Sequence, residues 1–151
     1  MCYTAFVQTP FYACGFLYSL KHNKILLLQS KAQEDQPCLY SMLGGEGIEG
    51  EEALVSFQRI VNKLLNVNIK SKDIHPVYDY CHSSNDKPSF VFYADIKNIK
   101  NISGLEEGTF SWLKFSETIK LKFNTQTKQD MVIGERVINA KLRDLLIPVA
   151  V

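Results

Sequence analysis

The chain has 151 residues, of which 46% are hydrophobic and 22% are charged, a composition typical of a globular protein with one core of ordinary size. Seventeen basic residues nearly balance sixteen acidic ones, so no strong positive field favours nonspecific binding to DNA or to an anionic membrane. We therefore expect a single domain over residues 1–151 that binds neither DNA nor a membrane.

The four cysteines do not form a CxxC pair and lack the spacing of zinc ligands; they are Cys2, Cys14, Cys38 and Cys81. The opening residues MCYTAFVQTP lack the basic and apolar stretches of a signal peptide. No apolar run approaches the ~20 residues that cross a bilayer. We therefore expect reduced thiols in a cytoplasmic protein, with Cys14 and Cys81 packed in the core.

The first third of the chain predicts a β-hairpin. Two apolar runs, residues 11–20 and 24–29, flank the short polar segment Lys21-His22-Asn23, which is the pattern of two antiparallel strands around a turn. A polar connection over residues 30–37 then leads to a short predicted strand over residues 39–43.

The next segment predicts an amphipathic helix over residues 51–65. Its apolar side chains recur at intervals of three, four and three residues, at Leu54, Phe57, Val61 and Leu64. Acidic residues at 51 and 52 fall in its expected first turn, where negative charge suits the helix dipole. Asn66, just past the apolar stripe, is a suitable helix end.

The second half predicts more strands and a closing helix. Residues 73–81, 88–96 and 112–115 have the apolar and β-branched character of strands, and Lys120, Lys122 and Phe123 alternate like a solvated edge strand. Residues 130–146 predict a final helix with an imperfect apolar face that ends before Pro148. Strands that outnumber two well-separated helices predict an α/β (α+β) domain in which helices sandwich a mixed sheet.

A motif with a defined spacing spans the junction between the short strand and the first helix. Gly45 is followed after five residues by Glu51, and Glu51 is followed after seven residues by Arg59. An apolar residue, Val67, closes the segment, and acidic residues precede a Trp-apolar strand at Trp112 further along. In this spacing and order of elements, residues 11–147 resemble the Nudix hydrolase family, which implies a Nudix-type α/β/α sandwich.

The second half of the Nudix signature is missing. Three positions where family members carry metal-binding glutamates are occupied by Ile60, Lys63 and Leu64. In addition, Asn66 stands in place of a glycine and Leu43 in place of the usual proline. Positions 60, 63 and 64 lie on one face of a helix, so the formal charge of that face changes from −3 in the family to +1 here. Because Mg²⁺ requires oxygen ligands, we expect no standard metal site on this face.

The resemblance implies roles for several remaining residues. Glu51 and Arg59 occupy catalytic positions of the motif, and Glu107 lies in the region from which a loop glutamate acts as catalytic base in the family. Without catalysis, Glu51 and Arg59 can pair as a brace between loop and helix. A relocated Mg²⁺ or Mn²⁺ site would use Glu51 and Glu52, with Glu106 or Glu107.

Three hypotheses about function stay open from the sequence. The first is a protein that binds a nucleoside diphosphate-linked compound through Gly44, Gly45, Lys63 and Glu106 with weak or no hydrolysis, the lysine replacing the metal as the positive charge. The second is an active pyrophosphohydrolase that holds Mg²⁺ or Mn²⁺ with displaced acidic residues. The third is an interaction module on a Nudix fold, and the resemblance is compatible with a homodimer.

Overall fold

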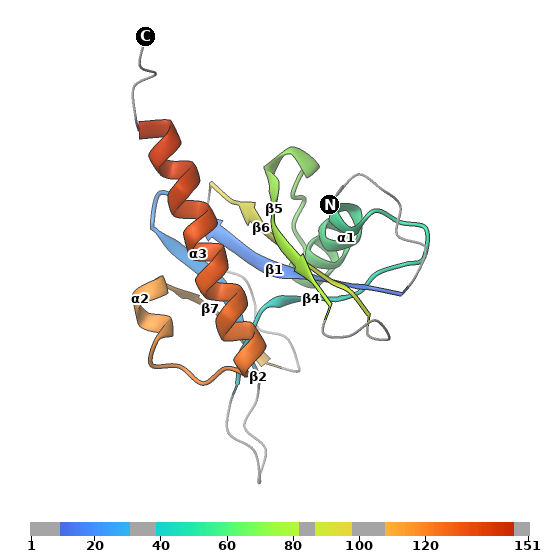
Figure 1. Cartoon of the computed structure of the whole chain (residues 1–151), viewed down its shortest axis with the longest axis horizontal. Helices are drawn as coiled ribbons and strands as arrows, with labels where there is room; N and C mark the ends of the chain where they lie inside the picture. Colours follow the sequence, from blue (N-terminus) through green and yellow to red (C-terminus); the bar gives the residue numbers. More distant parts are fainter. Residues whose placement is uncertain (1–9, 31–38, 82–86, 98–107, 147–151) are drawn as a thin grey trace.

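The computed structural model describes residues 10–30, 39–81, 87–97 and 108–146 (Figure 1). Its elements, in chain order, are β1 (Tyr12–Ser19), β2 (Lys24–Ser30), β3 (Tyr40–Ser41), β4 (Leu43–Glu46), α1 (Ala53–Leu65), the 3₁₀ turn η1 (Ser71–Asp73), β5 (Ile74–Tyr80), β6 (Ser89–Asp95), β7 (Gly108–Leu113), α2 (Phe115–Thr118) and α3 (Thr125–Leu146).

The strands form one mixed sheet in which β1 is central. The sheet has the order β3-β2-β1-β6-β5, with β4 paired to β1 and β7 paired to β2. Strands β1 and β6 run parallel over Tyr12–Tyr18, and the remaining pairs are antiparallel. The predicted hairpin of β1 and β2 is confirmed, with Leu17 opposite Leu26.

Helices cover both faces of this sheet (Figure 1). Because side chains alternate across a strand, β1 supplies both cores. Ala13 and Leu17 belong to the core under α1, together with Phe57 and Val61 of that helix. Phe16 and Tyr18 belong to the core under α3. The predicted α/β/α sandwich is therefore confirmed.

Helix α1 ends where the sequence predicts. Asn66 adopts a left-handed conformation, with φ of 53°, that stops the helix. The Asn62 side chain then accepts a hydrogen bond from the Ile69 amide (2.7 Å), and Gln58 donates to the Ile69 carbonyl (2.9 Å). These bonds fold the following segment back against the helix, so the helix end is fixed by side chains as well as by its cap.

Several predicted boundaries are wrong. Helix α1 begins at Ala53, because Glu52 has extended dihedral angles, so the two glutamates precede the helix. Helix α3 begins at Thr125, since its first turns are polar and apolar periodicity does not detect them. The last predicted strand is β7, Gly108–Leu113, and ends before Phe115, which opens α2. No helix within the described ranges is long and apolar enough to cross a membrane.

Two further predictions are wrong for local reasons. Lys120, Lys122 and Phe123 lie in the connection between α2 and α3 rather than in a strand. The Tyr40 amide donates a hydrogen bond to the Lys122 carbonyl at 3.0 Å and ties this connection to the sheet. Cys81 is exposed just past β5, whereas Cys14 is largely buried as expected. Cys2 and Cys38 lie outside the described residues.

The double glycine generates a stability prediction. A Cβ on Gly44, whose φ is +155°, would lie 2.5 Å from the Ala13 carbonyl oxygen and 2.6 Å from the Cys14 Cα. Because both neighbours are backbone atoms of β1, we expect Gly44→Ala to cost at least about 2 kcal/mol in unfolding free energy. The change in unfolding free energy is measured by urea titration monitored by circular dichroism.

Gly45→Ala is the matched control. The nearest atom to a Cβ at this position is Ile60 Cδ1 at 3.7 Å, an ordinary contact. We expect the control to change the unfolding free energy by less than about 1 kcal/mol. Equal losses in the two variants would contradict the close approach of β4 to β1.

Candidate functional site

The double glycine lies within a strand rather than in a free turn. Gly44 is opposite Cys14 and Gly45 is opposite Ala13 in the antiparallel pair of β4 and β1. After β4 the Gly47 amide still bonds the Phe11 carbonyl at 2.8 Å, and the chain then turns through Gly50, with φ of 84°, into α1. The glycines therefore bring the start of α1 close to the first half of β1.

Glu51 anchors this turn to α1. One of its carboxylate oxygens accepts a bond from Arg59 Nη2 at 3.2 Å, and both oxygens lie 3.4 Å from Arg59 Nε. The buried Ser56 hydroxyl donates to the same carboxylate. The Glu51 amide also bonds the Ile48 carbonyl at 3.0 Å. The brace between loop and helix that the sequence suggested is present.

The surroundings of Glu51 favour its charged form. Partial burial alone would raise its pKa, but hydrogen bonds from Ser56 and Arg59, together with the guanidinium charge, outweigh that effect and lower the pKa of Glu51. Because that pKa is lowered, Glu51 is ionised and is a weak proton acceptor at neutral pH. In this geometry Glu51 and Arg59 position the loop on the helix.

The helix face that carries metal ligands in the Nudix signature has different chemistry here. Ile60 is half-buried, with its Cδ1 near the Gly45 backbone. Leu64 packs against the core under α1, and Lys63 is exposed. Two hydrocarbons and an ammonium offer no oxygen ligand, so these residues do not fit a Mg²⁺ or Mn²⁺ site. Within the described part of the chain, no three His, Cys, Asp or Glu side chains are grouped to hold a metal.

The other acidic residues of this region are scattered. Glu52 caps the start of α1 with its backbone and makes no side-chain capping bond. Glu46 pairs with Lys87 at 2.6 Å. Glu106 and Glu107 lie outside the described residues. Of the predicted site residues, Glu51 and Arg59 contact each other, Gly45 lies beside Ile60 of the same helix, and Lys63 is exposed on that helix.

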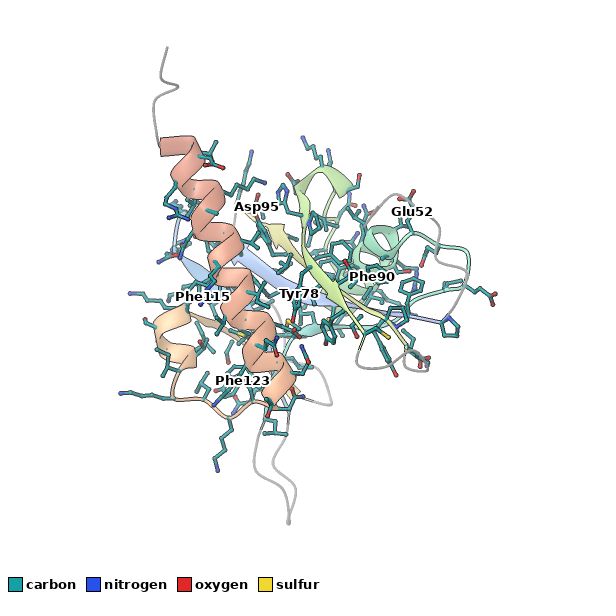
Figure 2. The ribbon with its side chains drawn as sticks, in the orientation of Figure 1. Glu52, Tyr78, Phe90, Asp95, Phe115 and Phe123 are labelled. Atoms are coloured by element: carbon teal, nitrogen blue, oxygen red, sulfur yellow. The ribbon has the colours of Figure 1, made fainter. Side chains whose placement is uncertain are left out.

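A buried polar cluster on the opposite face of the sheet escaped the sequence prediction. Asp130 of α3 is 1% exposed and accepts bonds from the Tyr78 hydroxyl of β5 and from Gln126 Nε2, the latter at 2.9 Å. Figure 2 shows Tyr78 where β5 passes α3. The sequence signal was available, because Asp130 lies three residues after Thr127 and beside Met131 on the buried stripe of α3.

This cluster suppresses ionisation of its neighbours. Burial, assisted by the Asp130 carboxylate, raises the pKa of Cys14 to about 12, so the thiol is neutral at physiological pH. Burial also raises the pKa of Tyr80 to about 12, and Asp130 adds to the shift. Neutral hydroxyls suit donation to a buried carboxylate. The cluster therefore stabilises the contact of α3 with the sheet and provides no activated nucleophile.

Several solved structures have an architecture similar to that of this chain. A mutT/nudix family protein from Listeria innocua is 16% identical and superposes with a TM-score of 0.67, covering 90% of this chain and 98% of that one. The NUDIX domain of Shewanella oneidensis NrtR, solved with ADP ribose, gives 14% identity and a TM-score of 0.65, covering 89% and 90%. The E. coli dihydroneopterin triphosphate pyrophosphohydrolase gives 17% identity and a TM-score of 0.63, covering 89% and 99%.

The chain has the Nudix fold. No protein-family model matches its sequence, and no curated protein matches it either. The Nudix likeness is therefore carried by the arrangement of the elements, at identities where few individual side chains are shared.

The Glu51 brace generates a pH-dependent stability prediction. Because its pKa is lowered in the folded state, ionised Glu51 stabilises the fold above the pKa of the unfolded chain, near the ordinary value of 4.5. That contribution is lost as the pH falls through the lower folded-state pKa. We expect Glu51→Gln to cost about 1 kcal/mol at pH 7 and progressively less below about pH 4.5, measured by urea unfolding across pH.

Glu49→Gln, at an exposed position two residues earlier, is the matched control and should change the unfolding free energy by less than about 0.5 kcal/mol. If Glu51→Gln left stability unchanged at pH 7, the ion pair with Arg59 would not brace the turn.

Proposed function

We propose that this protein binds a nucleoside diphosphate-linked compound and hydrolyses it weakly or not at all. The observation that carries the proposal is the face of α1 beside the double glycine, where Ile60 and Lys63 stand at metal-ligand positions of the Nudix signature. The adjoining Glu51, Arg59 and Ser56 remain paired with one another. The shape of the turn is kept, while the carboxylates that would hold a catalytic metal are absent from this face.

Electrostatics supports binding without a metal. A carboxylate about 5 Å from a divalent cation contributes several kcal/mol at an effective dielectric constant of ~20, before desolvation. This face lacks three such attractions and adds the repulsion of Lys63. A diphosphate, in contrast to a metal cation, is attracted to this face, because the exposed ammonium of Lys63 attracts phosphate oxygens directly. Lys63 is therefore assigned the role of neutralising the diphosphate.

Two fold neighbours support the choice of ligand class. The NUDIX domain of NrtR has been solved with ADP ribose, a nucleoside diphosphate-linked sugar. The same fold in the E. coli dihydroneopterin triphosphate pyrophosphohydrolase belongs to an enzyme that acts on a triphosphate. Both ligands contain linked phosphates, so a phosphate-linked compound is the class to test first.

The first test measures binding and turnover together. Purified protein is titrated with ADP-ribose, ADP and nucleoside triphosphates by calorimetry in EDTA, and again with Mg²⁺ or Mn²⁺, while released phosphate products are quantified. We expect binding in EDTA and little or no metal-dependent turnover. Lys63→Glu should weaken binding at least about tenfold, because it replaces attraction by repulsion.

Lys120→Glu, an exposed position in the connection between α2 and α3, is the matched charge reversal and should leave affinity unchanged. Metal-dependent turnover that is lost in Glu51→Gln would replace the proposal with an active hydrolase that uses displaced acidic residues. If the protein showed neither binding nor turnover, the remaining hypothesis would be an interaction module on the Nudix fold.

A gain-of-site variant tests the same reasoning in reverse. Ile60→Glu combined with Lys63→Glu places two carboxylates on the face beside Gly45, while Leu64 stays in its core contact. We expect this variant to gain measurable Mn²⁺ affinity over the native chain, detected by loss of the free Mn²⁺ electron paramagnetic resonance signal. Tighter Mn²⁺ binding by the native chain than by the variant would contradict it.

A further inference from the structure

A cavity lies at the other end of β1 from the double glycine. It has a volume of about 490 Å³ and is bounded by the turn after β1, the end of β6 and the C-terminal half of α3. Its walls include the apolar side chains of Ile138, Leu142 and Leu145. Tyr18, which also lines it, is four residues beyond Cys14, the partner of Gly44, or about 13 Å along the strand. This cavity is therefore separate from the Nudix-motif region.

Lysines from separate segments surround the cavity. Lys21 follows β1, Lys97 follows β6, and Lys141 is on α3. A neighbouring groove of about 710 Å³ shares Asp73, Asp95, Ile96 and Lys97 with the cavity and adds Lys70 and Lys72. Five lysines thus face two aspartates, a formal excess of three positive charges in a chain whose net charge is +1.

One of the two aspartates is already engaged. Asp95 lies 3.0 Å from His75 Nε2, and Lys141 Nζ lies 2.9 Å from His75 Nδ1. Lys141 also lies over the Tyr93 ring, 5.9 Å from its centroid. Figure 2 shows Asp95 beside the C-terminal half of α3. These contacts hold Lys141 at the edge of the cavity, where Lys21 and Lys97 are also exposed.

The walls indicate which kind of anion fits. Tyr18 and Tyr93 are each 2% exposed, so their rings offer no open face on which a nucleobase can stack. The accessible wall is aliphatic, and two of its leucines are open to solvent: Leu20 is 58% exposed and Leu145 is 73% exposed. Aliphatic side chains among lysines match a ligand with an apolar body and an anionic head.

We propose that this cavity binds an amphipathic organic anion, with its apolar body against α3 and its anionic head among Lys21, Lys97 and Lys141. The site goes beyond the proposed nucleotide function, since it shares no residue with the Nudix-motif region. Its charge and its aliphatic wall must act together, so an inorganic anion or a cationic amphiphile of equal chain length should bind poorly.

The test uses anilinonaphthalene sulfonate, an aromatic sulfonate whose fluorescence rises on binding. The native chain is compared with Lys21→Glu/Lys97→Glu and with the matched double reversal Lys120→Glu/Lys128→Glu, which lies away from the cavity. We expect the dissociation constant to rise at least about tenfold in the first variant and to stay unchanged in the second. Decanoate should displace the probe, whereas inorganic phosphate and decyltrimethylammonium should not.

Leu145→Ser, at an exposed position, tests the apolar wall independently. It should also weaken binding of the probe without lowering the melting temperature of the protein. The proposal is overturned by equal affinity of the two double variants, or by decyltrimethylammonium competing as well as decanoate. Loss of ADP-ribose binding with the cavity site intact would count against the proposed nucleotide function alone.

Discussion

Strand β1 is the element on which the rest of the structure depends. It is bonded to β6 along its whole length on one side, and on the other side to β4 in its first half and β2 in its second. Its alternate side chains begin both cores. Where other backbones approach β1 closely, only glycine fits. A side chain at Gly15 of β1 would collide with the Phe92 backbone, and a side chain at Gly44 of β4 would collide with the β1 backbone. The placement of α1 and α3 follows from this strand.

The Nudix-like turn shows how one motif can separate into two physical tasks. Glu51, Ser56 and Arg59 shape the loop and fasten it to α1 through bonds that are independent of any ligand. Ile60, Lys63 and Leu64 take no part in those bonds, so the brace does not require carboxylates at these positions. In the proposed function, Lys63 replaces the metal on a loop whose shape is maintained by the bonds among Glu51, Ser56 and Arg59.

The fold was largely predictable because its signals are local. The hairpin of β1 and β2, the apolar stripe of α1 and the Asn66 helix end all arise from patterns within a few residues. The failures have physical reasons as well. Glu52 takes an extended conformation that no apolar period reports, Cys81 falls just past the end of its strand, and the pairing of Gly44 with β1 requires a partner thirty residues away. Site residues in the connection before β7 lie outside the described residues and stay predictions.

The buried carboxylate of Asp130 constrains the position of α3 on the sheet. Its partners include Tyr78 on the sheet and Gln126 one turn earlier on the same helix. A rotation of α3 by one residue, about 100°, or a slide by one turn would move the carboxylate away from the tyrosine and leave it buried without that donor. Asp130 therefore helps to fix the rotation and axial position of α3, and with them the position of Lys141 at the edge of the cavity.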